Sequence, residues 1–317
     1  MKKISKILLV FVVAVFSIVS LTGCNKNKDN ENKLTIVTTN FPSYDFARAV
    51  VKDNNDVELK MLLKPGAESH EFEPTPQDVI EIKNCSLFIY TGGESDEWIT
   101  DILDDIDTDK TKVIKMMDLV DVKEEEKVEG MEDEEEDHEE EVEYDEHVWT
   151  SPLNAIKIVN ALRDEMVSID NVNKRLYENS AKEYTDKLVT IDNEFKDIVQ
   201  NAKRNEIIFG DRFPLRYFVD EYNLKYYAAF PGCSAQTEAS AKTISYLVDK
   251  VKEDKIPVVF HIELSNGKIA EAISKETGAK VLEFNTAHNI SQNDFDAGVT
   301  YVDIMEGNTK VLKEALN

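Results

Sequence analysis

Short apolar runs alternate with helix-forming segments in the first third of the chain. Threonine favours the helix N-cap and proline the first helical position, so Thr75 and Pro76 predict the start of a helix. Residues 43–51 predict a second helix, and apolar residues between 98 and 106 recur at helical spacing. Four runs have the length of strands: residues 34–39, 57–62, 87–90 and 113–116. Strands that alternate with helices predict a parallel sheet covered on both faces.

The same alternation resumes after residue 204. The predicted strands are residues 206–209, 224–230, 257–263 and 280–284, and the predicted helices are 215–222, 239–252, 268–277 and 302–316. The chain therefore contains two regions with one pattern, and each has enough apolar residues to bury a core. At 317 residues, the length suits two domains.

A long helix is predicted between these two regions. Ser151-Pro152 begins a helix that reaches residue 168, and residues 172–202 form the longest periodic element, roughly 45 Å at ~1.5 Å per residue. One apolar stripe runs along it: Tyr184, Leu188, Ile191, Phe195, Ile198 and Ala202. We therefore predict an α/β fold of two βα lobes, residues 34–168 and 204–317, joined by a linking helix at 169–203 with a cleft between them.

The N-terminus has the features of a secretory signal. Three lysines in the first six residues precede an apolar run at 7–21, and small residues then lead to Cys24. The run is shorter than the roughly 20 residues of a membrane span, and Leu-Thr-Gly-Cys resembles a bacterial lipobox. We expect residues 1–23 to be a lipoprotein signal peptide, Cys24 to be lipidated, and 24–33 to be a tether.

Acidic residues dominate the charge and are concentrated in one segment. The chain has 63 acidic and 37 basic residues, a net charge of −26, which excludes the basic face of a nucleic-acid binder. Residues 121–146 contain 17 acidic residues and two lysines. This composition predicts a disordered or mobile loop, which either concentrates cations or only solubilises the protein. Cys85 and Cys233 fall in different predicted lobes, so we expect two separate thiols.

Four of the five histidines come at or after the carboxyl end of a predicted strand: His70, His147, His261 and His288. Ligands of open α/β sheets bind outside these strand ends, so two histidines from each lobe are expected to face one cleft. Neutral imidazole suits zinc, copper, nickel or iron, and carboxylates can complete the coordination. The histidines therefore predict a metal site.

Each candidate ligand also has a structural interpretation. His261 is alternatively a core histidine on a buried strand, and Glu263, on the same strand face, is either a ligand or the carboxylate that supports one. His70, His147 and His288 are alternatively residues that shape loops or helix ends. His138 lies within the acidic run, where we expect it to be solvated, with at most an auxiliary metal contact.

Enzyme signatures are mostly absent. His70-Glu71 does not begin a His-Glu-x-x-His motif because Pro74 occupies the last position, and the sequence has no nucleophile elbow or phosphate loop. We therefore predict a protein that is not an enzyme. The rival interpretations are a surface-anchored metalloenzyme, with Glu263 as its general base, and a binder of an organic solute.

Two motifs, residues 70–76 (HEFEPTP) and 145–149 (DEHVW), resemble those of the zinc/manganese solute-binding lipoproteins of ABC transporters. The resemblance covers residues 33–317 and includes the long helix and the acidic segment before the second motif. It implies that His70 and His147 are the two ligands of the first lobe.

The second lobe departs from the family pattern. The resemblance implies a third ligand, His or Glu, near residues 209–213, where this sequence has Gly210. It implies an aspartate after the last strand, where Asn285 and then His288 occur. We therefore expect His288 to join His70 and His147, with Glu263 or His261 as the fourth ligand. Such a nitrogen-rich site favours zinc over manganese.

By resemblance, the protein is held by Cys24 on the extracytoplasmic face of a bacterial membrane. There it captures a divalent metal ion, Zn²⁺, and delivers it to the permease of an ABC transporter. The alternatives are Mn²⁺ or iron as cargo, or a role in adhesion or metal buffering. We expect a monomer, and metal binding that weakens below about pH 6 as histidines become protonated.

Overall fold

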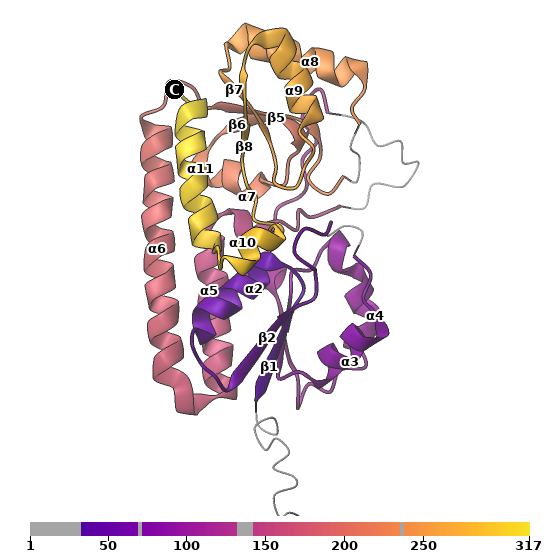
Figure 1. The fold of residues 1–317 in the computed structure, drawn as a ribbon, viewed down its shortest axis with the longest axis vertical. Helices are drawn as coiled ribbons and strands as arrows, with labels where there is room; N and C mark the ends of the chain where they lie inside the picture. Colours follow the sequence, from indigo (N-terminus) through magenta and orange to yellow (C-terminus); the bar gives the residue numbers. More distant parts are fainter. Residues whose placement is uncertain (1–32, 69–71, 132–141, 235–237) are drawn as a thin grey trace, which may run out of the picture. The chain divides into compact units, whose positions relative to one another are not determined.

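Four strands of the first region form one sheet in the computed structural model, which describes residues 33–68, 72–131, 142–234 and 238–317 (Figure 1). They are β1 (Leu34–Thr38), β2 (Val57–Met61), β3 (Leu87–Tyr90) and β4 (Lys112–Lys115), in the order β2-β1-β3-β4. β3 pairs in parallel with β1 and β4. All four residues of β3 are buried, as expected for a central strand covered on both faces.

The second region repeats this arrangement. Its strands are β5 (Glu206–Arg212), β6 (Lys225–Phe230), β7 (Val258–His261) and β8 (Lys280–Glu283), in the order β6-β5-β7-β8. All its adjacent strands pair in parallel. In both sheets the chain crosses from one side of its first strand to the other, which opens a crevice at the carboxyl ends of the strands. The predicted two-lobe α/β fold is confirmed.

Local capping signals explain where several helices begin. The α-helices around the sheets are α2 (Phe41–Val51), α3 (Pro76–Asn84), α4 (Thr100–Leu103), α5 (Pro152–Ile169), α7 (Arg216–Tyr222), α8 (Ala241–Asp254), α9 (Lys268–Thr277), α10 (Gln292–Asp296) and α11 (Tyr301–Ala315). The short 3₁₀ helices are η1 (Glu94–Ile99), η2 (Met116–Leu119), η3 (Val148–Thr150) and η4 (Asn171–Asn173). Thr75 and Ser151 cap α3 and α5, as predicted.

Some predicted boundaries were wrong. α2 begins at Phe41 because Asn40 caps it and forms a capping box with Ser43. The segment at 98–106 is mostly not α-helical: η1 covers its start, and α4 spans only four residues. β7 ends at His261, so Glu263 belongs to the loop after the strand. The short helix α10 was not predicted.

The linking helix is α6 (Lys174–Gln200), which runs beside α5 and α11 (Figure 1). Its apolar stripe is buried at Tyr184, Leu188, Ile191 and Phe195. The helix contacts α2 of the first lobe and α7 and α11 of the second lobe. Its 27 residues correspond to roughly 40 Å at ~1.5 Å per residue, so one rigid element packs against both lobes.

Buried hydrogen bonds also connect the two lobes, which lie in one compact unit, Thr35–Asn317. The Trp149 indole donates to the Thr286 carbonyl oxygen at 2.9 Å, and the Tyr301 hydroxyl donates to the Trp149 carbonyl oxygen at 2.6 Å. The buried Asp45 carboxylate accepts from the Tyr301 backbone N–H and from the Tyr184 hydroxyl. These bonds join α2, η3, α6 and α11.

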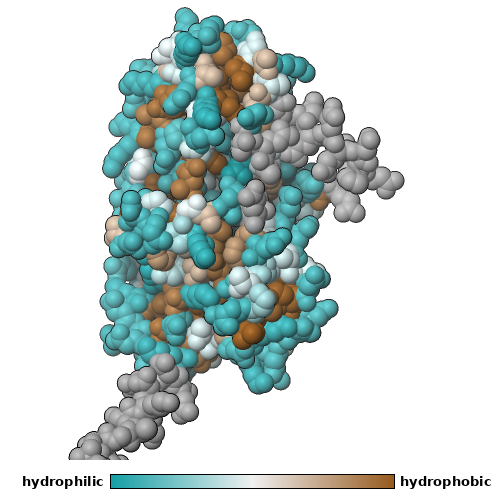
Figure 2. All heavy atoms as spheres, turned by 45° about the vertical axis from the view of Figure 1, so that its right-hand side comes forward, coloured by the Kyte–Doolittle hydropathy of each residue, from teal (hydrophilic) through white to brown (hydrophobic). Residues whose placement is uncertain are grey.

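Hydrophilic residues cover most of the face shown in Figure 2, and hydrophobic residues appear there in separate groups. Within the described ranges, no helix has the length and apolar character needed to cross a membrane. Cys85 and Cys233 are free thiols, as expected. Burial raises the pKa of Cys85 to about 12, so this thiol is unreactive at neutral pH.

Candidate metal centre

Three side chains from the two lobes converge at the carboxyl ends of the sheets. One ligand atom each from Glu146, His147 and His288 lies within 4.8 Å of the others. The structure thus brings together His147 and His288 and adds Glu146, which was not among the predicted ligands. Cys24, His70 and His138 lie outside the described residues.

Glu146 is buried and held by the start of η1. Its Oε2 accepts a hydrogen bond from the Ser95 backbone N–H at 2.9 Å, and its Oε1 accepts from the Ser95 hydroxyl at 2.5 Å. Gly93 makes this approach possible: it has a positive φ of 78°, and a Cβ there would lie 2.5 Å from the Glu146 Cβ. Gly93 therefore shapes the site, and its contact with Glu146, far along the chain, could not be inferred from the spacing of residues.

His147 is fully buried and oriented by its neighbour Asp145. One oxygen of Asp145, Oδ1, lies 3.1 Å from His147 Nδ1 and also accepts from the His147 backbone N–H at 2.8 Å. Contact of Nδ1 with a carboxylate is the usual way to orient an imidazole so that Nε2 coordinates a metal. Burial disfavours the imidazolium, but the carboxylates of Asp145, Glu146 and Glu125 outweigh it and raise the pKa of His147.

Aromatic packing places the second histidine beside the first. The His147 and His288 rings have centroids 5.0 Å apart and are nearly perpendicular. The ring of Trp149 lies 5.4 Å from that of His147 and 5.1 Å from that of His288. Trp149 also donates a hydrogen bond to the Thr286 carbonyl oxygen, so one buried indole contacts both histidines and links the two lobes at this point.

Glu263 holds the loop that carries His288. Its Oε1 accepts from the His288 backbone N–H at 2.9 Å and from the Thr286 hydroxyl at 2.7 Å, and its Oε2 accepts from the Thr286 backbone N–H at 2.7 Å. Burial raises the pKa of Glu263, although these hydrogen bonds favour its charged form. Both oxygens are therefore engaged by the 286–288 loop.

The other second-lobe candidates are not in the group of converging side chains. His261 places its Nδ1 2.9 Å from the Ile262 carbonyl oxygen, at the end of β7. In the 209–213 segment, the buried Asp211 accepts hydrogen bonds from the backbone N–H groups of Arg212 and Ile262. Neither His261 nor Asp211 joins Glu146, His147 and His288 in the part of the chain that the structure describes.

Residues 121–131 and 142–146 of the acidic segment make defined contacts, so the prediction of a mobile loop was wrong for these residues. Glu124 and Tyr144 form an antiparallel bridge, and the Glu125 carboxylate accepts from the Cys233 backbone N–H at 3.0 Å. The Tyr217 hydroxyl donates to the Asp145 carbonyl oxygen at 2.6 Å. Contacts with the second lobe therefore hold the two ends of the segment in place despite their acidic composition.

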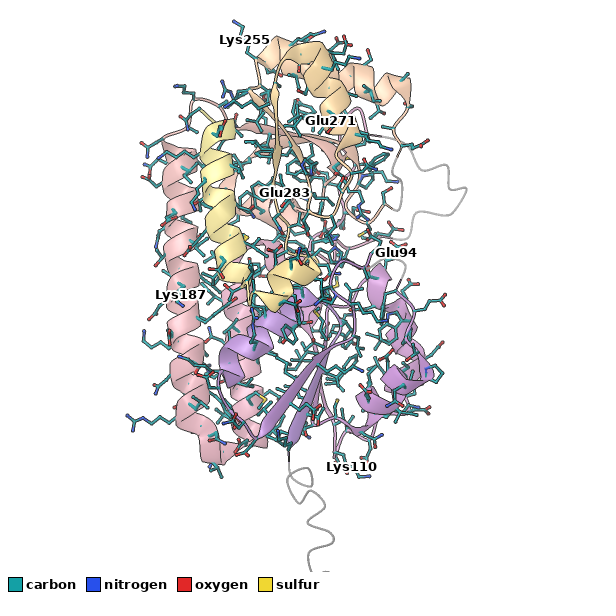
Figure 3. The ribbon with its side chains drawn as sticks, viewed as in Figure 1. Glu94, Lys110, Lys187, Lys255, Glu271 and Glu283 are labelled. Atoms are coloured by element: carbon teal, nitrogen blue, oxygen red, sulfur yellow. The ribbon has the colours of Figure 1, made fainter. Side chains whose placement is uncertain are left out.

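Negative charge gathers around the centre. Partial desolvation and the nearby carboxylates of Glu143, Glu146 and Glu125 raise the pKa of Glu94, which lies at the start of η1 (Figure 3). Burial likewise raises the pKa values of Glu125 and Glu146. A divalent cation would compensate these crowded carboxylates, because opposite charges favour the ionised form.

Two imidazoles and a carboxylate that meet between two α/β lobes define a metal-binding protein of the two-lobe class. Comparison with known proteins then gives the family. The chain belongs to the family described as zinc-uptake complex component A, periplasmic, whose model matches residues 36–315.

Individual relatives agree with this assignment. The zinc-binding lipoprotein AdcA of Streptococcus pneumoniae (strain ATCC BAA-255 / R6) is 34% identical over 314 residues, which are 99% of this chain and 61% of AdcA. The chain thus spans less than two thirds of that relative. The high-affinity zinc uptake system protein ZnuA of Bacillus subtilis (strain 168) is 32% identical, with 96% of each protein covered. The crystal structure of the Zn(II)-bound ZnuA-like domain of Streptococcus pneumoniae AdcA has a TM-score of 0.74 at 30% identity, covering 90% of this chain and 99% of that domain.

Proposed function

We propose that this protein captures Zn²⁺ outside the cytoplasm and delivers it to the membrane permease of an ABC transporter. The observation that carries the proposal is the convergence of Glu146, His147 and His288 from two lobes within 4.8 Å. A metal ion bound by residues of both lobes binds the closed arrangement better than the open one. Metal binding thereby favours the closed state, which the permease can distinguish from the open state.

The donor set supports zinc as the cargo. Two imidazoles and one carboxylate suit zinc, and His70, the first-lobe ligand implied by the family motif, would complete a four-coordinate shell. Zinc stands far above manganese in the affinity order for such a site. Relatives named for zinc binding and zinc uptake support the same choice.

In this proposal Glu263 positions the site and His261 has no ligand role. Glu263 uses both oxygens to hold the 286–288 loop, which fits a supporting carboxylate better than a ligand. We further propose that the protein catalyses no reaction, acts as a monomer and is anchored to the lipid bilayer through Cys24.

Calorimetric titration of the metal-free full chain, purified in detergent micelles, tests metal capture. At about pH 7.5, where most histidines are neutral, we expect saturable one-to-one binding of zinc and weaker binding of manganese. Absence of saturable zinc binding would overturn the proposal. Tighter binding of manganese than zinc would overturn only the choice of cargo.

Growth of a strain that lacks the protein tests delivery. We expect poor growth when zinc is chelated and recovery when excess zinc is added, because excess metal bypasses the carrier. Normal growth of this strain when zinc is chelated, together with poor adhesion to host surfaces, would favour the adhesin alternative.

A further inference from the structure

Arg212 connects the second lobe to a first-lobe loop beside the metal centre. Its Nη2 lies 3.0 Å from Glu68 Oε2, and its Nη1 lies 3.4 Å from Glu68 Oε1. Two parallel contacts of this kind form a bidentate pair, which is more specific in geometry than a single contact. The pair joins residues 144 positions apart in the chain.

The arginine is held firmly on its own side. Arg212 is the last residue of β5, its backbone N–H donates to Asp211 Oδ1, and Asp211 Oδ2 accepts from the Ile262 backbone N–H. Its Nη1 also donates to the Ser234 carbonyl oxygen at 3.3 Å. The side chain of Arg212 is 16% exposed and that of Glu68 is 44% exposed. A fixed, largely buried guanidinium therefore pairs with a more accessible carboxylate.

The Glu68 side of the pair belongs to the loop between β2 and α3. The second lobe already holds this loop by neutral bonds: the Gly66 backbone N–H donates to the Ile290 carbonyl oxygen at 2.8 Å. The Asn289 amide donates to the carbonyl oxygens of Lys64 and Ala67. Glu68 precedes His70 by two residues in the sequence. The ion pair thus adds a charged contact at the end of the 64–68 segment, the end that is closer to His70 in the sequence.

We propose that Arg212 is a positioning residue for metal retention. Its bidentate pair with Glu68 holds the 64–68 loop of the first lobe against the second lobe and slows release of the bound metal. The proposal rests on the proposed capture of zinc. Because one partner is largely buried, we expect loss of the pair to speed zinc release about tenfold, equivalent to ~1.4 kcal/mol.

The rate of zinc transfer to a chelator, followed by stopped flow on the full chain in detergent micelles, tests the proposal. Arg212→Gln and Glu68→Gln are each expected to speed release, and the double variant to be no faster than either single variant. The charge swap Arg212→Glu/Glu68→Arg should recover part of the slow release. Arg163→Gln is the matched control, because Arg163 pairs with Asp164 on the exposed side of α5. Unchanged release in both single variants, or additive effects in the double variant, would overturn the proposal.

Salt dependence separates an electrostatic contact from a general loss of structure. We expect release from the wild-type protein to accelerate as ionic strength rises, because salt screens a partly exposed pair, and release from Arg212→Gln to depend less on salt. Equal salt slopes in the two proteins would overturn the electrostatic role.

A measurement without metal keeps this proposal distinct from the proposed function. Hydrogen exchange of the Gly66 amide, measured on the metal-free chain, is expected to be several-fold faster in Arg212→Gln than in the wild type or Arg163→Gln. If wild-type protein fails to bind zinc, the proposed function falls, and the exchange rate still decides whether the pair holds the loop. Equal exchange in the three proteins would overturn the positioning role.

Discussion

The two lobes contribute to the metal centre in different ways. The first lobe supplies adjacent residues, Asp145, Glu146 and His147, so that the proposed ligands Glu146 and His147 and the carboxylate that orients His147 lie in one short motif. The second lobe supplies His288 on a loop held by Glu263, which lies 25 residues earlier in the chain. In the first half, a neighbouring carboxylate orients the imidazole of His147 directly. In the second half, a carboxylate instead holds the backbone of the loop that carries His288. The same coordination chemistry can therefore be built locally or through tertiary contacts.

The largest expected effect comes from removing a proposed ligand of either half. We expect His147→Ala and His288→Ala each to weaken zinc binding by roughly a hundredfold or more, because loss of a supporting residue alone costs about 10–100-fold. Competition titration with a zinc chelator measures the loss. His261→Ala is the matched control and should leave the affinity unchanged. A loss in His147→Ala alone would show that the second half does not supply a ligand.

Removing the supporting carboxylate of the second half should affect both binding and folding. Glu263→Ala leaves three donors without an acceptor, two of them buried, so we expect the free energy of unfolding to fall by ~1–3 kcal/mol. Zinc affinity should fall by about 10–100-fold. Chemical denaturation of the metal-free protein, with exposed Glu276→Ala as the control, measures the first effect. Unchanged stability in Glu263→Ala would contradict the role of Glu263.

Acid should release zinc mainly by protonating His147, in the first half of the site. The raised pKa of His147 means that protons compete with the metal at a higher pH than for an ordinary histidine, near 6.5. Zinc affinity should therefore begin to fall above that pH, and not only below about pH 6 as expected for ordinary histidines. Asp145→Asn removes a negative charge, lowers the pKa of His147 and should move the fall to lower pH. Titrations across the range from about pH 8 to pH 5 test this, and an affinity that stays constant throughout would contradict it.

A buried carboxylate beside Glu146 should make the metal-free protein sensitive to pH. Desolvation is the main reason that the pKa of Asp96 rises to about 7, although it accepts from the backbone N–H groups of Thr91 and Gly92. Because the folded pKa of Asp96 is raised, its contribution to stability is fully present below its ordinary pKa of 3.8 and is lost as the pH rises from there through about 7. Asp96→Asn should remove this loss and stabilise the metal-free protein by ~1–2 kcal/mol at about pH 8. Thermal unfolding at several pH values measures it; an equal pH slope in the variant would refute it.

The smallest effect concerns backbone strain in the second half. Leu264 directly follows Glu263, has a positive φ of 59° and is 52% exposed. A left-handed conformation costs a non-glycine residue roughly 1–2 kcal/mol, and glycine avoids this cost. Glycine also loses more backbone entropy on folding, which offsets part of the stabilisation. Leu264→Gly should therefore stabilise the protein by less than ~1 kcal/mol in chemical denaturation, whereas Leu264→Ala keeps the strain and should not. Equal stabilities of the two variants would argue against strain at this position.

The sequence alone was sufficient for the local features. Periodicity and capping residues predicted both sheets and the long helix, because strand alternation and N-cap bonds depend on neighbours within a few residues. The positions of His147 and His288 after predicted strands also predicted that the two side chains meet, because the carboxyl ends of parallel strands share one edge. The structure brings these two residues together.

Only the tertiary structure decided how the site is assembled. Glu146 joins the centre because Gly93 and Ser95, about 50 residues earlier, fit around it. Glu263 turns to the 286–288 loop, His261 stays outside, and the ends of the acidic segment pack against the second lobe. No periodicity encodes these choices. They depend on which buried polar groups find partners after the lobes have come together, since an unpaired buried group costs more free energy than most sequence preferences provide.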